Sequence, residues 1–294
     1  MEIKKISPQG FCQGVIKAIQ TINKLLDDPS IVKPIYMYGS LVHNKHIIET
    51  YKDKGIIIVE DIENIHEGTI IITAHGVSDK VKDTIKSRNL TLIDTTCKYV
   101  NKTHELIREK LISDYEVVFY GKRTHPETKG VLGISNKIHL VENIEDVNQL
   151  NIKSQKIIFT TQTTMSYLEV VKIIEAIKTK YPHTSTFEDV CTATKSRQLA
   201  LINQVKGYDL CIVVGDPKSN NTNKLKEVCD TFTSVKCIMI ENINDLQNID
   251  LTNHKKIAIT AGASTPPRIV NEVIEGIKNN DFTSKLTIED FIKF

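Results

Sequence analysis

The 294-residue sequence has no excess of charge of either sign and no long hydrophobic run. Its 38 basic and 36 acidic residues leave a formal net charge of +2, so we expect no strong field toward nucleic acid or a membrane surface. No apolar run reaches the ~18 residues of a membrane span. The first residues, MEIKKISPQG, lack the apolar core of a signal peptide and the composition of a transit peptide. These absences predict a soluble protein, cytoplasmic if bacterial, or of a plastid-type organelle if a transit peptide has been trimmed.

Familiar metal and cofactor patterns are also missing. No cysteine pair has the CxxC spacing of a structural zinc site, no HxxxH or HExxH pattern indicates histidine-bound metal, and no GxGxxG fingerprint indicates a nicotinamide or flavin cofactor. Six cysteines stand singly, at positions 12, 97, 191, 211, 229 and 237. A disulfide framework is not expected in a reducing compartment. The cysteines are therefore apolar packing thiols, reactive thiols or dispersed metal ligands.

The sequence does contain an internal pattern that occurs three times. A β-branched apolar run that ends in a polar or glycine turn occurs as IIITAHGVS (70–78), IIFTTQTTMS (157–166) and IAITAGAST (257–265). An amphipathic, helix-like segment follows each run. Further upstream, short apolar runs end in Gly39, Gly121 and Gly215. Each repeat therefore predicts alternating strands and helices.

Such alternation, with nearly continuous apolar strands, is typical of parallel sheets covered by helices. We predict an α/β fold of three pseudo-symmetric parallel-sheet units arranged as a trefoil around a central site. The predicted boundaries are 1–97, 98–191 and 192–281, followed by a C-terminal tail at 282–294. Three separate units without a shared centre are the alternative.

Three of the cysteines follow the repeat. Cys12, Cys97 and Cys191 each stand directly before an amphipathic segment, where a helix begins. A helix N-terminus favours an anion such as a thiolate. Three thiolates can hold three irons of a [4Fe–4S] cubane and leave the fourth iron open, whereas full ligation needs four cysteines. The pattern thus predicts a central iron–sulfur site, although each cysteine can also simply pack a helix start.

The other three cysteines, Cys211, Cys229 and Cys237, have no counterparts in the other repeats. They lie in or beside apolar segments of the last third of the chain. We therefore expect them to be packing thiols.

The loops after the strands carry hydrogen-bond donors. The first loop of each repeat supplies His43, His125 and the run Ser219, Asn220 and Asn221. The second loop supplies His75, Thr163 and Ser264. Because ligands of parallel sheets gather at the carboxyl ends of the strands, these donors predict a phosphate or diphosphate site. Metal ligation is the alternative for the histidines.

One loop carboxylate stands apart. Glu127 follows His125 by two residues, in a loop that should face the predicted centre. No second loop carboxylate occupies a comparable position, so Glu127 is predicted to be a lone proton donor rather than half of an acid–base pair. A solvated loop glutamate is the alternative.

The motifs GFCxGV, LVHN, TAHGV, IDTTCxxV, THPET, TQTT, CxATxxRQ, SNNTNKL and GAS occur in this order over about residues 3–280. As an ordered set they resemble the IspH/LytB family of 4-hydroxy-3-methylbut-2-enyl diphosphate reductases. The resemblance implies a three-lobed α/β fold with one central [4Fe–4S] cluster per chain. It also implies reductive dehydroxylation of (E)-4-hydroxy-3-methylbut-2-enyl diphosphate to isopentenyl and dimethylallyl diphosphate, the last step of the non-mevalonate isoprenoid pathway.

The resemblance also implies roles for residues of this chain. The cluster ligands would be Cys12, Cys97 and Cys191, with the substrate hydroxyl on the open iron. The diphosphate would be bound by His43, His75, His125, Ser219, Asn220, Asn221 and Ser264. Thr163 would orient the substrate hydroxyl or the water that replaces it, and Glu127 would deliver protons. The chain departs from the pattern at Asn220, where many members have serine.

Electrons must come from another protein, and the resemblance implies a ferredoxin or a flavodoxin. We expect a monomer or weak dimer with a small-molecule allylic diphosphate substrate and neither nucleic acid nor membrane as partner. Two other functions fit the residues alone. One is a mononuclear zinc hydrolase that acts on a phosphorylated substrate and holds zinc through the three cysteines. The other is a non-catalytic phosphometabolite or redox sensor with the same cluster.

Overall fold

The strands form three four-stranded sheets in the computed structural model, which describes residues 1–293. Every strand pairing within residues 1–293 is parallel. The chain divides into two compact bodies. We call residues 20–41 and 56–191 the middle body, and residues 1–19, 42–55 and those from Thr192 onward the terminal body.

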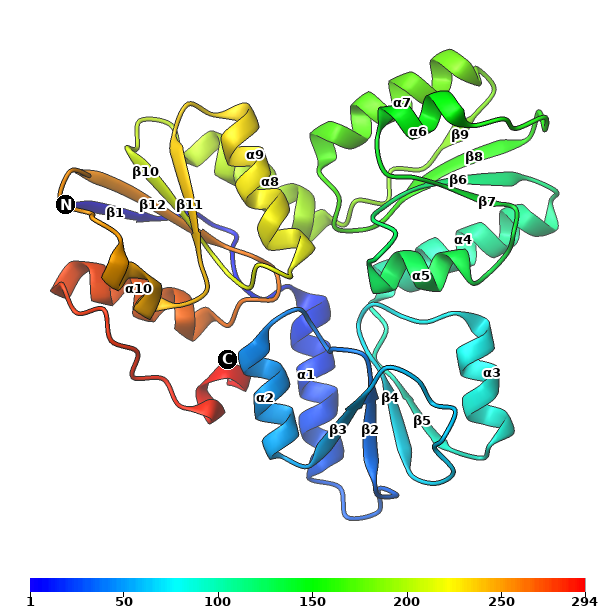
Figure 1. Ribbon diagram of the computed structural model, residues 1–294, viewed down its shortest axis with the longest axis horizontal. Coiled ribbons are helices and arrows are strands. Elements are labelled where there is room, and N and C mark those ends of the chain that lie inside the picture. The colour runs from blue at the N-terminus through cyan, green and yellow to red at the C-terminus, as the bar shows by residue number, and fades with distance from the viewer. Residues whose placement is uncertain (294) are drawn as a thin grey trace. The chain divides into compact units, whose positions relative to one another are not determined.

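The middle body holds two of the sheets (Figure 1). The first has the order β3 (Ile56–Val59), β2 (Ile35–Tyr38), β4 (Thr69–Ile72) and β5 (Thr91–Asp94). The second has the order β7 (Ile138–Val141), β6 (Glu116–Tyr120), β8 (Ile157–Thr161) and β9 (Ser185–Thr186). The helices are α3 (Asp79–Ser87), α4 (Lys98–Ile112), α5 (Pro126–Leu132), α6 (Ile144–Gln149) and α7 (Tyr167–Lys180).

The terminal body holds the third sheet, with the order β1 (Glu2–Lys5), β12 (Lys256–Ala261), β10 (Leu210–Val214) and β11 (Lys236–Ile240). Its helices are α2 (Lys45–Asp53), α8 (Thr192–Gln204), α9 (Asn220–Phe232) and α10 (Pro267–Asn279). The first turns of α1 (Gln13–Leu26) and the 3₁₀ segments η1 (Ile243–Asn248) and η2 (Ile288–Ile292) also belong to it.

The three sheets share one strand order, which confirms the predicted α/β fold of three pseudo-symmetric parallel sheets. β5 and β9 hold one edge of their sheets, and β1 holds the same edge of the third sheet. Glu2 of β1 pairs with Lys256 of β12, so the first strand of the chain completes the sheet of the last repeat. The boundaries drawn at 1–97, 98–191 and 192–281 stay a prediction, and residues 2–5 pair outside the first of them.

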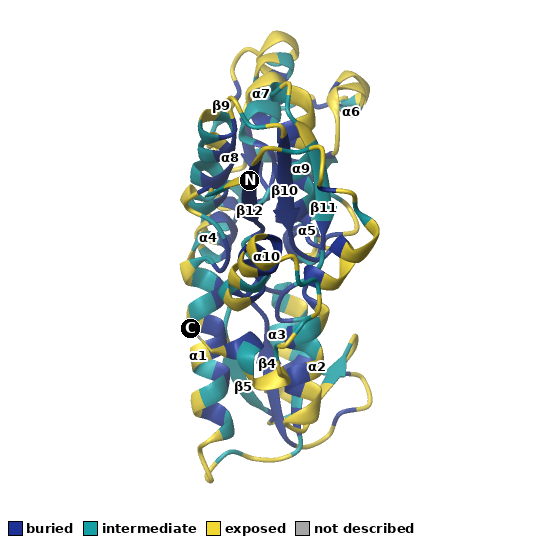
Figure 2. Ribbon diagram, turned by 90° about the vertical axis from the view of Figure 1, so that its left-hand side faces the viewer, coloured by how far each residue is buried: buried dark blue, intermediate teal, exposed yellow. Residues whose placement is uncertain are grey.

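The central strands are buried because helices cover both faces of each sheet. All residues of β4, β8 and β10 are buried, as expected for the apolar runs TIII, IIFTT and LCIVV. Figure 2 shows β10 and most of β12 in the colour of buried residues, whereas Lys256 at the start of β12 and Ile57 of β3 are exposed. No helix within residues 1–293 combines the length and the apolar character needed to cross a membrane.

A glycine follows each of β2, β6 and β10, at the start of the loop that carries the predicted donors. Gly215 has φ +151°, and a Cβ there would lie 2.5 Å from Thr222 Oγ1 and 2.7 Å from Thr265 Oγ1. A Cβ on Gly121 would lie 2.7 Å from Thr128 Oγ1. Only glycine lets these loops pack so closely on the following helices.

The C-terminal tail packs on α2, within the terminal body (Figure 1). Thr50 Oγ1 lies 3.1 Å from the carbonyl oxygen of Ile288. Lys54 Nζ forms an ion pair with Glu289 at 3.1 Å. The rings of His46 and Phe291 stack with centroids 4.5 Å apart. The tail therefore acts as a strap along α2.

Candidate active site

Each of the three repeat cysteines follows an edge strand and directly precedes a helix. The N–H groups of Cys12, Cys97 and Cys191 donate to loop carbonyl oxygens of Ala263, Ala74 and Thr163, at 3.2, 3.0 and 3.0 Å. Each acceptor lies two residues beyond the last strand residue of β12, β4 or β8. The backbone thus holds the cysteines at equivalent positions of the three sheets, with Cys12 attached to the third.

The thiol groups of these three cysteines are suitable ligands for an iron–sulfur cluster. All six cysteines lie within the described residues, and none of them forms a disulfide. Cys12, Cys97 and Cys191 are half-buried, and each directly precedes a helix. Cysteine thiolate is the usual ligand of such clusters. Cys12 belongs to the terminal body, and Cys97 and Cys191 belong to the middle body.

The strand register places the second loop differently from the sequence pattern. Ile72, Thr161 and Ala261 pair with the residues immediately before Gly39, Gly121 and Gly215. The third residue after each of these strand ends is His75, Thr164 or Ser264. Thr164, rather than Thr163, therefore occupies the position equivalent to His75 and Ser264. Thr163 takes the place of Ala74 and Ala263, whose carbonyl groups hold the other cysteines.

In the middle body, Glu127 and Thr163 form a buried pair. Glu127 is the second residue of α5 and is only 1% exposed. Its Oε1 accepts from the Thr163 N–H at 2.8 Å, and its Oε2 lies 2.9 Å from Thr163 Oγ1. Since the Thr163 carbonyl accepts from Cys191 N–H, one residue joins the carboxyl group to the cysteine loop.

Burial gives this carboxyl group an unusual proton affinity. Desolvation raises the pKa of Glu127 from 4.5 to about 7, against the two hydrogen bonds from Thr163, which lower it. The negative charge of Asp189 adds to the increase. Glu127 therefore holds and releases a proton near neutral pH, as a general acid requires.

Two of the predicted histidines lie side by side in the same body. The rings of His75 and His125 meet edge to face, with centroids 5.3 Å apart. His125 is the N-cap of α5, and its Nδ1 accepts from the Glu127 N–H at 3.2 Å. This bond leaves Nε2 as the nitrogen that carries the proton in neutral His125.

In the terminal body, the predicted hydroxyl groups meet at the N-terminus of α9. Ser219 caps this helix by accepting from Thr222 N–H at 3.3 Å. Ser264 Oγ lies 3.1 Å from Ser219 Oγ and 3.2 Å from the carbonyl oxygen of His43. Burial lowers the pKa of His43, so its imidazole is neutral at pH 7. Donors and a helix N-terminus thus gather as an anion site requires.

The two asparagines differ in their surroundings. Asn221 donates to Thr194 Oγ1 at 3.1 Å and accepts from Ala263 N–H at 2.9 Å. It therefore joins α9 to α8 and to the loop that holds Cys12. Asn220, which replaces the serine of many family members, is 4% exposed. Both lie in the first turn of α9 beside Ser219.

Sequence reasoning missed three buried residues that support the site. Arg197 donates to the carbonyl oxygens of Gly10 and Phe11 at 2.6 and 3.3 Å, directly before Cys12. Gln162 Oε1 accepts from Lys122 N–H at 3.0 Å. Asp216 accepts from Lys45 N–H at 3.0 Å. The CxATxxRQ and TQTT motifs contain the first two, so those letters were the available signal.

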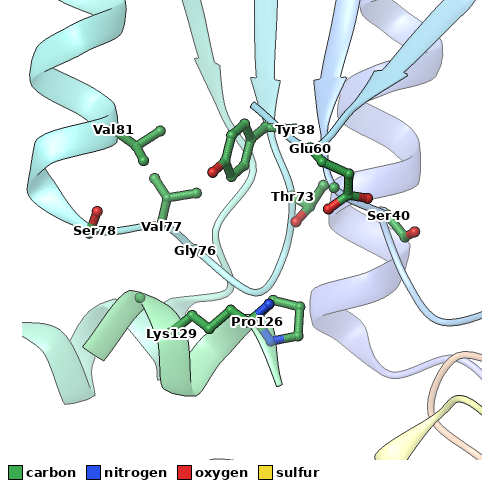
Figure 3. A pocket seen from close by; sticks show the side chains of 12 residues that line it. Tyr38, Ser40, Glu60, Thr73, Gly76, Val77, Ser78, Val81, Pro126 and Lys129 are labelled. Carbon is green, nitrogen blue, oxygen red and sulfur yellow. The ribbon is translucent and has the colours of Figure 1, made fainter. Parts of the chain in front are cut away.

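A polar pocket lies beside the middle-body residues (Figure 3). It is lined by Tyr38, Gly39, Ser40, Glu60, Thr73, Gly76, Val77, Ser78, Val81, Pro126, Lys129 and Gly130. Figure 3 shows Thr73, Glu60 and Ser40 on one side and Lys129 and Pro126 of α5 on another. The lining includes the sequence neighbours of His75, His125 and Glu127 but none of these three residues.

The family model described as LytB protein matches residues 3–278. The 4-hydroxy-3-methylbut-2-enyl diphosphate reductase of Anoxybacillus flavithermus is 43% identical over 288 residues, which cover 96% of this chain and 91% of the relative.

Two solved structures are similar to this chain. The E-1-hydroxy-2-methyl-but-2-enyl-4-diphosphate reductase from Plasmodium falciparum superposes with a TM-score of 0.90 at 32% identity, covering 96% of this chain and 89% of that one. The other is (E)-4-hydroxy-3-methyl-but-2-enyl diphosphate reductase, described as the terminal enzyme of the non-mevalonate pathway. It has a TM-score of 0.68 at 27% identity and covers 95% of this chain and 100% of that one.

Proposed function

This chain belongs to the LytB family of 4-hydroxy-3-methylbut-2-enyl diphosphate reductases, and from that premise we propose which residues carry each part of the reaction. The enzyme reductively dehydroxylates (E)-4-hydroxy-3-methylbut-2-enyl diphosphate to isopentenyl diphosphate and dimethylallyl diphosphate. This is the last step of the non-mevalonate (MEP) isoprenoid pathway. The relatives are reductases, which favours this activity over a zinc hydrolase or a sensor.

The cysteines at the three equivalent helix starts, Cys12, Cys97 and Cys191, would hold a [4Fe–4S] cluster. When bound, this group supplies two electrons, one at a time, and an iron without a protein ligand that acts as a Lewis acid toward the substrate hydroxyl. Half-buried thiols, fixed through their backbone N–H groups, support the assignment.

The diphosphate would be bound by neutral or hydroxyl donors rather than by a cluster of cations. The proposed set is His43, His75, His125, Ser219, Asn220, Asn221 and Ser264. The lowered pKa of His43 and the capped start of α9 support it, because neutral donors and a helix N-terminus stabilise an anion without a lysine. Holding the diphosphate fixes the other end of the substrate for reaction.

Glu127 would deliver the proton to the departing oxygen, and Thr163 would orient the hydroxyl group of the substrate. A carboxyl group with a pKa of about 7 is protonated in half of the molecules at neutral pH. Thr163 binds Glu127 through both its N–H and its hydroxyl group. Loss of the protonated hydroxyl group as water, together with the gain of two electrons, gives an allyl anion equivalent that accepts a proton at either end, which accounts for two products.

Electrons would come from another protein, because the sequence has no nicotinamide or flavin fingerprint, and the resemblance to the family implies a ferredoxin or a flavodoxin. We propose a cytoplasmic location, in line with the bacterial relatives, and a monomer or weak dimer.

The observation that carries the proposal is the link from the Glu127 carboxyl group through Thr163 to the backbone of Cys191. The test is anaerobic turnover with reduced methyl viologen and the allylic diphosphate. We expect both isopentenyl and dimethylallyl diphosphate. Iron-loaded protein that forms neither product would contradict the proposal.

A further inference from the structure

Three cysteines outside the candidate active site come together in the terminal body. The Sγ atoms of Cys211, Cys229 and Cys237 all lie within 4.8 Å of one another. They come from β10, α9 and β11, and Cys211 and Cys237 are direct partners in the parallel register. Both strand cysteines therefore point to the face that α9 covers, where Cys229 belongs to the same core cluster.

Packing does not require sulfur at these positions. The second sheet has the same strand order as the third. Val117 stands before Gly121 as Cys211 stands before Gly215, and Ile138 pairs with Val117 as Cys237 pairs with Cys211. Val131 of α5 packs in the same cluster as these two residues and, counted from the loop glycine, corresponds to Leu225 of α9. Branched apolar side chains thus stand at the positions of the two strand cysteines in the second sheet, and α5 ends before the position of Cys229, so the fold does not demand thiols there.

The distances suit one small ion. A metal bound to three sulfurs at about 2.3 Å places them roughly 3.8–4.0 Å apart, and small adjustments of thiols within 4.8 Å of one another provide this. Among residues 1–293, no fourth histidine, cysteine or carboxylate joins the group. Soft, sulfur-only donors select Zn²⁺ or Cu⁺ over hard cations.

The site also has access and nearby positive charge. Cys237 is only partly buried, and β11 is an edge strand. Lys226, one turn before Cys229 on α9, is close enough for its charge to act on Cys229 and Cys237. The same ammonium group forms an ion pair with Asp230, so its charge acts on that carboxylate as well as on the thiols.

We propose that Cys211, Cys229 and Cys237 form a binding site for one thiophilic closed-shell metal ion of the class of Zn²⁺ and Cu⁺. Each thiol that binds the ion releases its proton, and no electron transfer is involved. The site is independent of the iron–sulfur ligands and serves to join β10, α9 and β11.

The test compares metal content in two proteins. Iron-replete enzyme is incubated anaerobically with excess Zn²⁺ or Cu⁺, desalted, and analysed for zinc, copper and iron per chain. The control variant, Cys211→Val/Cys229→Val/Cys237→Ile, copies the second sheet at the two strand positions and places an apolar side chain on α9. We expect the wild type to retain one equivalent more of zinc or copper than the variant, at equal iron content, and the retained metal identifies the ion. Equal zinc and copper in both proteins would overturn the proposal.

X-ray absorption at the zinc or copper edge of the iron-replete wild type needs no folded variant. We expect a first shell of three sulfur atoms around the retained ion. A shell dominated by nitrogen and oxygen, or no retained ion, would overturn the proposal. Anaerobic turnover is measured on the same samples as the iron content. A protein that lacks this metal site but turns over the substrate is thereby distinguished from a protein that is not a reductase.

Discussion

At the scale of single residues, the chemistry depends most on Glu127. It is a fully buried carboxyl group on α5, and both its oxygens are bound by Thr163. Its sequence context, THPET, predicts a loop position and shows neither its place in the first turn of α5 nor its burial. Burial is what raises its pKa to about 7 and makes it suitable as an acid near neutral pH.

The substitution Glu127→Gln keeps the shape of the side chain and removes the exchangeable proton. We expect normal iron content and substrate binding, with turnover reduced about 10²- to 10⁴-fold, the usual contribution of a general acid. Anaerobic steady-state kinetics measure this loss, and Glu145→Gln, at an exposed position of the same body, is the matched control. Near-normal turnover of Glu127→Gln would remove this residue from proton delivery.

Glu127 also makes stability depend on pH. Its folded-state pKa of about 7 exceeds the ordinary 4.5, so the folded protein holds the proton more tightly than the unfolded chain. The stabilisation is complete below pH 4.5 and is lost as the pH rises through 7. The total is about 3 kcal/mol. Urea unfolding should show wild type losing this amount relative to Glu127→Gln between these pH values. Parallel curves for the two proteins would contradict the raised pKa.

At the scale of elements, the cysteine positions are set by a strand, a turn and a helix start. In each sheet an edge strand leads to a cysteine whose N–H donates to the loop beyond the central strand. The sequence predicted the helix starts, because amphipathic segments follow Cys12, Cys97 and Cys191. It did not predict that β1 pairs with β12, since pairing over such a sequence distance leaves no local pattern.

Cys191→Ser should lose the iron–sulfur cluster, because a serine hydroxyl is a poor ligand for iron. We expect little iron and sulfide per chain and loss of the visible absorption of the anaerobic protein. Cys237→Ser, which changes a cysteine that is not one of the proposed iron–sulfur ligands, should retain the iron and sulfide and the visible absorption. An intact cluster spectrum in Cys191→Ser would refute the ligand assignment.

The C-terminal strap holds α2, the helix that follows His43. Phe291 is 8% exposed and stacks on His46, so Phe291→Ala opens a cavity between η2 and α2. We expect a loss of about 3 kcal/mol in unfolding free energy and a higher KM for the diphosphate substrate. Ile288→Ala, at a position 46% exposed, is the control and should change stability little. An unchanged urea midpoint for Phe291→Ala would show that the strap does not stabilise α2.

At the scale of the whole molecule, the sequence predicted the three parallel sheets because their central strands are unbroken apolar runs with the same polar turn after each. It placed Thr163 one position out of register, since β8 extends to Thr161 where the pattern alone marks no strand end. It predicted Cys211, Cys229 and Cys237 as packing thiols, and they do lie in or against one core cluster, but it did not show that their sulfur atoms meet, because they come from three elements whose packing no periodicity reveals. Long-range packing, rather than local pattern, accounts for these differences.

The central claim is that Cys12, Cys97 and Cys191 alone hold a four-iron cluster, so that one iron is open to the substrate. The most direct measurement is the Mössbauer spectrum of ⁵⁷Fe-loaded protein, recorded anaerobically with and without the allylic diphosphate. We expect one quarter of the iron signal to differ from the rest and to change when the substrate binds. Four equivalent irons that do not respond to the substrate would contradict the claim.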